Sequence, residues 1–369
     1  MIKMQAPATT WLFGILLVVL LGSSMSMRAA SDAEAAEITQ EYDRLQSLWL
    51  SQMKLATDAR SRSIIAKKQP DPAEFAVKLK KLLRNDLAHD WTLKYAAWLL
   101  NNDPAITAQS QRTLLDAVQN HHLSSSKLGP FCVAMVQLND RGILPPAGKL
   151  PIRSRGMKLL KEIKTVNPSP EVQGQAALAL SIMLASLGDD PRIMAQRIQN
   201  LREAIIKSAD ISLGSVTVAD VARDELFKIN YLSRGKEAPE IVGSDSAGRP
   251  LRLSNFRGKV VMLVFWSSED PQVAKALELL RESAASKINK PFVMLGVNKD
   301  ALANLRTLEA ERIVTWRNFS DPSQKIAQLY HVSSWPYCMV LDQKGRIQHK
   351  GSVGSFADAV VNDLLVTKP

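Results

Sequence analysis

The two cysteines carry the most reactive side chains of this 369-residue chain. Cys132 lies in the apolar stretch 131–136 (FCVAMV), Cys338 lies in 337–341 (YCMVL), and neither has a second cysteine nearby. Thiol–disulfide exchange needs an accessible thiolate and a second thiol within reach. A cysteine in an apolar segment often packs as a small hydrophobic residue. Three roles stay open for the pair: two buried thiols, a disulfide between them, or an unconventional redox thiol.

The five histidines do not indicate a metal or catalytic centre. His121 and His122 are adjacent and point in different directions on a helix, whereas His89, His331 and His349 are isolated. The chain has no His-x-x-x-His or Cys-x-x-Cys spacing and no glycine-rich phosphate loop. We therefore expect neither a bound metal nor a cofactor.

A polar segment between two apolar patterns holds the remaining candidate groups. Residues 260–266 (VVMLVFW) predict a buried strand and residues 273–285 predict a helix. Between them, Asp270 is placed as the helix N-cap and Pro271 at the first helical position, which are favourable residues for a helix start.

Acid–base or nucleophilic chemistry in this segment is a minor alternative. Glu269 or Asp270 could act as a general base or as a rim that repels anions. A nucleophilic Ser267 or Ser268 with His331 as its base is less favoured, because the sequence offers no acid to orient the histidine.

The elements around this segment predict an α/β domain. Short apolar runs at 260–266, 292–297 and 337–341 are expected to be central strands, with helical stretches between them. This alternation predicts a parallel or mixed sheet. Residues 342–346 (DQKGR) predict a hairpin turn, which leads to a last strand from Ile347 and a helix over 355–365.

Residues 36–233 predict an all-helical module of helical-repeat-like character. Apolar residues recur at helical spacing through most of this stretch, but no second copy occurs at a fixed period. Residues 139–153 are rich in proline and glycine and predict a long loop that divides the module into two lobes.

Several short phrases occur in a set order from Gly235 onward. They are GKEAPEI at 235–241, LSNFRGKVV at 253–261, FW at 265–266, IVTWR at 313–317 and SWP at 334–336. In this order they resemble the redoxin, or thioredoxin-like, family, which includes exported bacterial thiol–disulfide oxidoreductases and AhpC/TSA-like redoxins. The resemblance implies a thioredoxin-like α/β domain over 235–367 with a cis peptide bond at Pro336. The expected architecture is thus a helical module followed by that domain.

The resemblance does not extend to the catalytic cysteines of the family. Working members hold Cys-x-x-Cys in the first turn of the helix, where the helix N-terminus lowers the thiol pKa. Here Asp270 takes the position of the nucleophile and Val273 that of the resolving cysteine. Neither side chain can attack a disulfide, so the sequence favours a redox-inactive domain over an enzyme.

Such a domain is expected to bind a protein or an extended peptide. The resemblance implies that Trp266, Trp335 and Pro336 line the binding surface. Two alternatives stay open: a thiol–disulfide oxidoreductase or peroxidase-like antioxidant activity that uses Cys338 or Cys132, and a membrane-tethered structural protein of the cell envelope.

The net charge of +11 does not indicate nucleic-acid binding. Lysine and arginine are scattered over the whole chain, whereas a nucleic-acid interface needs a clustered basic surface with interleaved aromatic residues.

Residues 1–30 predict a signal peptide or signal anchor. Lys3 precedes the apolar run 11–21, and small residues follow it. The run is shorter than the ~17–25 residues of a typical membrane-spanning helix. Cleavage and retention both stay open, because Arg28 sits unfavourably for cleavage after Ala30. We expect export to the periplasm or cell envelope, with a membrane tether if the segment is retained.

Overall fold

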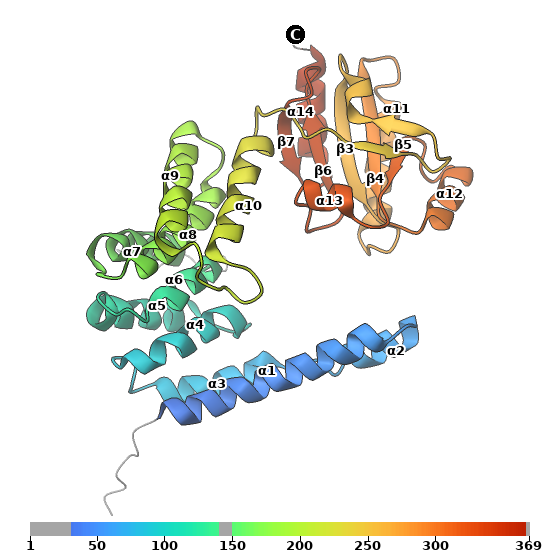
Figure 1. Cartoon of the computed structure of the whole chain (residues 1–369). Helices are drawn as coiled ribbons and strands as arrows, with labels where there is room; N and C mark the ends of the chain where they lie inside the picture. Colours follow the sequence, from blue (N-terminus) through green and yellow to red (C-terminus); the bar gives the residue numbers. More distant parts are fainter. Residues whose placement is uncertain (1–30, 140–149, 367–369) are drawn as a thin grey trace, which may run out of the picture.

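The computed structural model describes residues 31–139 and 150–366. These residues form an all-helical module followed by a sheet domain with helices on both faces, as the sequence predicts (Figure 1). The predicted signal segment at 1–30 and most of the predicted loop at 139–153 lie outside the described residues. No helix in the described ranges is long and apolar enough to cross a membrane.

Local sequence signals explain where the helices begin. Ser31 caps the first helix in a capping box with Glu34, and Pro72, Pro170 and Pro191 each stand at the first turn of a helix. The helical module contains α1 (Asp32–Leu55), α2 (Ala59–Ala66), α3 (Pro72–Leu83), α4 (Leu93–Asn102), α5 (Ala108–Ala117), α6 (Gly129–Ala134), α7 (Ile152–Val166), α8 (Pro170–Leu184), α9 (Pro191–Ser208) and α10 (Val218–Tyr231).

Helix α8 is the centre of the helical module. One hydrophobic core joins α1 and α3–α8, and a second joins α8, α9 and α10. The alanine-rich sequence of α8 allows close approach: a Cβ at Gly174 would lie 2.3 Å from Ser208 Oγ on α9. The predicted division into two lobes at 139–153 is wrong, because Leu138 before that stretch and Leu159 after it belong to the same core.

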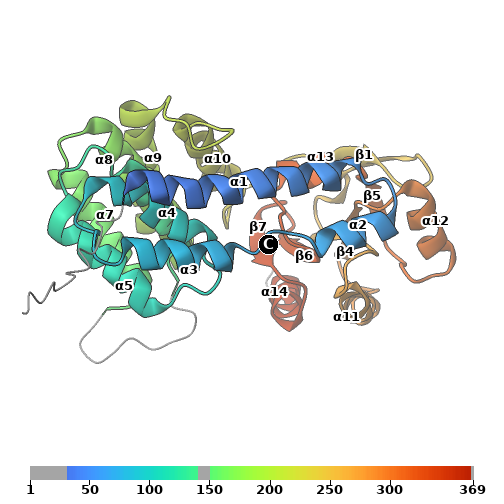
Figure 2. The ribbon, with the colours of Figure 1, turned by 90° about the horizontal axis from the view of Figure 1, so that it is seen from below.

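Helix α1 begins at Asp32, before the predicted start of the module at residue 36, and it reaches beyond the other helices of the module except α2. It extends beneath the sheet domain in Figure 1, and Figure 2 shows it from below, with α2 folded back at its far end. The indole N–H of Trp49 donates to the carbonyl of Ile65 at 2.9 Å and fixes α2 against α1.

The sheet domain has the mixed topology that the alternating pattern predicts. Its five-stranded sheet has the order β5-β4-β3-β6-β7, in which β3, β4 and β5 are parallel and β6 and β7 are antiparallel. The elements are β1 (Val242–Ser244), β2 (Pro250–Arg252), β3 (Val260–Trp266), α11 (Val273–Ala285), β4 (Phe292–Asn298), α12 (Leu302–Ala310), β5 (Arg317–Ser320), α13 (Lys325–Leu329), β6 (Tyr337–Leu341), β7 (Ile347–Gly351) and α14 (Ser355–Val366).

Side chains of β3 alternate between two cores. Val261, Leu263 and Phe265 pack on one face with α13, and Met262 and Val264 pack on the other with α11, α12 and α14. A strand that is buried on both faces reads as a continuous apolar run, which is why the sequence predicts its bounds correctly.

A partly buried ion pair joins the residues just after α11 to α14 on one face of the sheet. Lys287, whose side chain is 1% exposed, lies 2.6 Å from Asp358 Oδ1, and the Ser283 hydroxyl also donates to Asp358. Burial alone raises the pKa of Asp358, but the hydrogen bonds from Lys287 and Ser283 outweigh burial and lower it.

We expect Asp358→Ala to lower the free energy of unfolding by about 3 kcal/mol at pH 7, because it leaves the Lys287 ammonium buried without its carboxylate. Urea denaturation followed by circular dichroism measures the change. Glu278→Ala, an exposed position on α11, is the control and should stay within about 0.5 kcal/mol of the parent.

The same pair predicts a pH dependence. Because the pKa of Asp358 is lowered by folding, its contribution is present above the ordinary carboxyl value of 3.8 and is lost as the pH falls through the folded pKa. The difference between the parent and Asp358→Ala should therefore shrink below about pH 4; a difference that persists in acid would contradict this assignment.

Candidate functional site

An open groove of 860 Å³ lies where the β3–α11 connection faces the loop before β6. The connection and the first turns of α11 supply one wall, and residues 334–336 supply the other. The groove is lined by Asp270, Pro271, Gln272, Lys275, Ala276, Leu279, Ser334, Trp335, Pro336, Ser352 and Val353. It contains one of the two positions where the redoxin resemblance places a catalytic cysteine.

Asp270 reaches the groove but does not cap the helix, so that prediction is wrong. Helix α11 begins at Val273, and Gln272 occupies the N-cap position without a side-chain hydrogen bond. Asp270 instead belongs to a turn: its carbonyl accepts from Val273 N at 3.1 Å, and its carboxylate accepts from Gln272 N at 2.8 Å. Pro271 lies within this turn and precedes the helix.

Val273 lies in the core beneath the groove. It is 9% exposed and packs with Leu277 and Leu280 of α11 against the sheet. The position that the resemblance assigns to a resolving thiol is thus filled by an aliphatic side chain that stabilises the helix–sheet contact.

A buried carboxylate, which the sequence analysis did not identify, holds the chain at the end of β3. Asp300 Oδ1 accepts from the Ser267 hydroxyl at 2.5 Å, and its Oδ2 accepts from Ser268 N at 2.9 Å and from Asn298 Nδ2 at 3.0 Å. Burial raises the pKa of Asp300, but these hydrogen bonds outweigh burial and lower it. Asn298 and Asp300 follow shortly after the apolar run 292–297, and these polar residues at a strand end are the signal that could have located the buried carboxylate.

This network excludes Ser267 as a nucleophile. Its side chain is buried, and its proton is directed to Asp300. His331 lies elsewhere, 3.3 Å from Asp224 of α10 and against the ring of Phe227. The structure therefore does not bring together the serine–histidine pair that the sequence left open.

The opposite wall of the groove contains the predicted cis-proline. The Trp335–Pro336 peptide bond is cis. Trp335 is partly exposed, contacts Phe265 edge to face, and has Lys299 Nζ 4.7 Å from its ring centre. The backbone N–H and C=O groups of Ser334 and Trp335 have no hydrogen-bond partner in the described part of the chain.

Trp266 does not contribute to the groove, contrary to the sequence-based assignment. It is 0% exposed, and its indole N–H donates to Asn318 Oδ1 of β5 at 2.9 Å. Trp266 is the last residue of β3, where side chains point alternately to the two faces of the sheet. It therefore packs in the core that β3 shares with α11, α12 and α14.

Both cysteines are free and buried, which selects the first of the three roles left open by the sequence. Burial raises the pKa of Cys132 far above its usual range and raises the pKa of Cys338 to about 12. The Cys338 thiol donates to the Ser352 carbonyl at 3.5 Å, so it lies under a residue of the groove wall.

Within residues 31–139 and 150–366, no group of three or more His, Cys, Asp or Glu side chains is arranged to hold a metal ion. His122 is a buried structural residue: Nδ1 lies 2.8 Å from Asp90 Oδ1, and Nε2 lies 2.7 Å from the carbonyl of Leu87.

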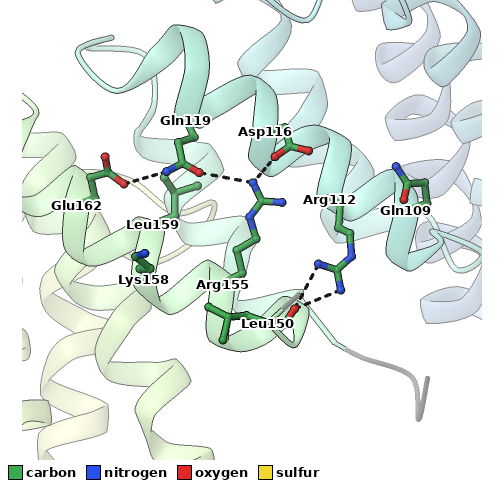
Figure 3. A pocket seen from close by; sticks show the side chains of 9 residues that line it. All are labelled: Gln109, Arg112, Asp116, Gln119, Leu150, Arg155, Lys158, Leu159 and Glu162. Carbon is green, nitrogen blue, oxygen red and sulfur yellow. Dashed lines mark hydrogen bonds and ion pairs between the residues drawn. The ribbon is translucent and has the colours of Figure 1, made fainter. Parts of the chain in front are cut away.

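A second hollow, in the helical module, is closed by its own charge pairs (Figure 3). Arg155 pairs with Asp116 and also contacts Gln119 at 3.5 Å. The Arg112 guanidinium donates twice to the carbonyl of Leu150, at 3.2 Å for each nitrogen. Arg112 and Arg155 are thus both held by neighbouring groups, and the Arg155–Asp116 pair connects α7 to α5 across the hollow.

Comparison with known proteins places the resemblance in the second half of the chain. The AhpC/TSA family model matches residues 234–350. The thiol-disulfide oxidoreductase ResA of Bacillus subtilis is 23% identical over 141 residues, which are 36% of this chain and 75% of that protein. ResA of Geobacillus thermodenitrificans is 25% identical over 115 residues, which are 31% of this chain and 66% of that protein.

A solved structure is similar to part of the chain. The thioredoxin domain of a thiol-disulfide oxidoreductase from Bacteroides vulgatus is 23% identical, with 36% of this chain and 98% of that chain covered and a TM-score of 0.34. The family model and the two ResA relatives identify residues 234–350 as a redoxin, or thioredoxin-like, domain.

Proposed function

We propose that this protein is an exported redoxin-domain protein that has no thiol–disulfide activity and binds a protein or extended peptide in the groove between α11 and Pro336. The observation that carries the proposal is the pair Asp270 and Val273, which stand at the two cysteine positions of the family. The proposed export rests on the apolar run at 11–21.

The absence of thiol chemistry follows from nucleophilicity. A disulfide is attacked by a thiolate, and a buried thiol with a pKa near 12 or above is almost fully protonated at neutral pH. Cys132 and Cys338 are both 0% exposed, and they lie in the cores of different modules. Neither can approach a disulfide in another protein without local unfolding.

Peptide binding is supported by the composition of the groove. The unpaired backbone groups of Ser334 and Trp335 are the kind of edge that forms main-chain hydrogen bonds with an extended strand. Leu279 is 41% exposed on the facing wall, and Trp335, Pro336 and Val353 add apolar surface. A peptide with apolar side chains at alternate positions fits this arrangement.

An oxidoreductase that uses Cys338 is the second candidate, because its sulfur lies under the groove residue Ser352. It requires the thiol to become exposed and ionised, whereas burial favours the protonated form.

We expect iodoacetamide to modify neither cysteine in the native protein at pH 8 and both cysteines in urea, because access requires unfolding. Intact-mass spectrometry counts the added groups. Rapid native labelling of Cys338, together with insulin reduction that is lost in Cys338→Ala, would favour the second candidate.

We expect the double substitution Asp270→Cys with Val273→Cys to create insulin-reductase activity that the parent lacks. The two positions stand at the start of α11, where the helix N-terminus stabilises a thiolate. Insulin turbidity with dithiothreitol as reductant measures the activity. The control is Asp270→Ser with Val273→Ser, and activity in the parent equal to that of the dithiol variant would contradict the proposal.

We expect peptides selected on the protein from a random display library to bind Leu279→Glu at least roughly tenfold more weakly than the parent, because the exposed leucine would contact an apolar side chain of the peptide. Fluorescence anisotropy with labelled peptides gives the dissociation constants.

The matched control is Ile288→Glu, which adds the same charge at a position that is 81% exposed and outside the groove. It should bind the selected peptides like the parent. Peptides that bind Leu279→Glu and the parent equally would place the binding surface elsewhere and contradict the groove assignment.

A further inference from the structure

A third pocket, of 540 Å³, lies between the helical module and the redoxin domain. Figure 1 shows β7 and α14 on the side of the sheet domain that faces α10. The pocket is lined from the helical module by Ala185, Gly188, Asp189, Arg197, Glu225, Lys228 and Ser233, and from the redoxin side by Arg234, Ile347, Gln348, His349, Lys350, Phe356 and Val360. Neither module contains the pocket by itself.

Hydrogen bonds to the backbone hold the two walls together. Lys350 Nζ donates to the carbonyl of Leu232 at 3.0 Å, and Arg234 N donates to Asp189 Oδ2 at 3.0 Å. These contacts connect the end of the helical module to β7 and the start of the redoxin domain to Asp189.

Cations outnumber carboxylates in the lining. Arg197, Lys228, Arg234 and Lys350 face only Asp189 and Glu225. Glu225 is already shared by two of the cations, since it lies 2.9 Å from Arg197 Nη2 and 2.8 Å from Lys228 Nζ. Lys228 has a further partner in Asp224, which stands behind the lining.

One cation of the lining is unpaired. The guanidinium of Arg234 has no partner among the described residues, and it is close enough to His349 to lower the pKa of the imidazole together with burial. The lining of the pocket therefore carries a positive charge that no carboxylate of the lining neutralises.

Two buried polar atoms in the lining also lack a partner. Arg197 is only 5% exposed, yet its Nε donates no hydrogen bond, and the Nε2 of His349 is likewise buried and unsatisfied. The Arg197 Nε–H is a buried donor without an acceptor, which carries a desolvation penalty that an anionic acceptor would remove. Both atoms belong to residues of this one pocket.

The far wall is apolar and exposed. Phe356 is 69% exposed and packs edge to face on His349, with Val360 one turn further along α14. An inorganic ion would leave this surface uncovered, whereas an organic group attached to the anion would cover it.

From this arrangement we propose that the pocket between the modules binds a small organic carboxylate, with its carboxylate directed to Arg197, Arg234 and His349 and its apolar group against Phe356. The site is separate from the groove at Pro336, so the proposal does not depend on peptide binding there. Because both modules supply the lining, an occupant also joins them.

The experiment titrates the full chain with benzoate and follows the His349 ring resonances by NMR, with its uncharged analogue benzamide as the matched probe. We expect saturable shifts with benzoate and none with benzamide. Arg234→Gln should weaken benzoate binding by about fivefold, the upper range for one exposed charge contact. Arg234 is exposed, so this variant should melt like the parent.

The control variant Arg202→Gln removes the same charge from an exposed position on α9 outside the pocket and should leave benzoate binding unchanged. Phe356→Ala should bring the affinity for benzoate down to that for acetate. Absence of a saturable shift with benzoate, equal shifts with benzamide, or equal weakening by Arg234→Gln and Arg202→Gln would each overturn the proposal.

Discussion

The redoxin domain depends on one strand that is buried on both faces. β3 pairs with β4 in parallel and with β6 in antiparallel register, and its side chains fill both cores of the domain. Where that strand ends, the chain has to leave the sheet without exposing the core. Asp300 makes this possible, because it accepts hydrogen bonds from the first residues after the strand and fixes the position from which the groove wall starts.

The structure contains the strand, the following helix and the cis-proline loop that the redoxin resemblance predicts. At the two positions that the resemblance assigns to the cysteines, it holds a turn carboxylate and a core aliphatic. Val273 gives the helix an additional apolar contact, and Asp270 satisfies a backbone N–H that would otherwise lack a partner. The Asp270 and Val273 side chains are therefore both consistent with a stable start of helix α11.

The sequence predicts the bounds of those strands and helices that have a clear apolar periodicity or a local start or turn signal. The bounds of β3, α11 and β6 follow from apolar runs, and the hairpin before β7 follows from its Asp and Gly residues. Contacts between distant residues are not encoded in this way: Ser267 and Asp300, or Trp266 and Asn318, meet only because neighbouring strands bring them together. The wrong assignment of Asp270 as the N-cap has a local reason, because an Asp-Pro pair suits a turn as well as a helix start.

Helix α8 is a wall of both hydrophobic cores of the helical module. Eleven of its fifteen residues are buried, so the apolar surface of α8 extends around most of the helix. Loss of either neighbouring group of helices would expose an apolar side of α8 to water. The two cores are thus energetically coupled, and the helical module should denature as one cooperative unit, without a half-folded state.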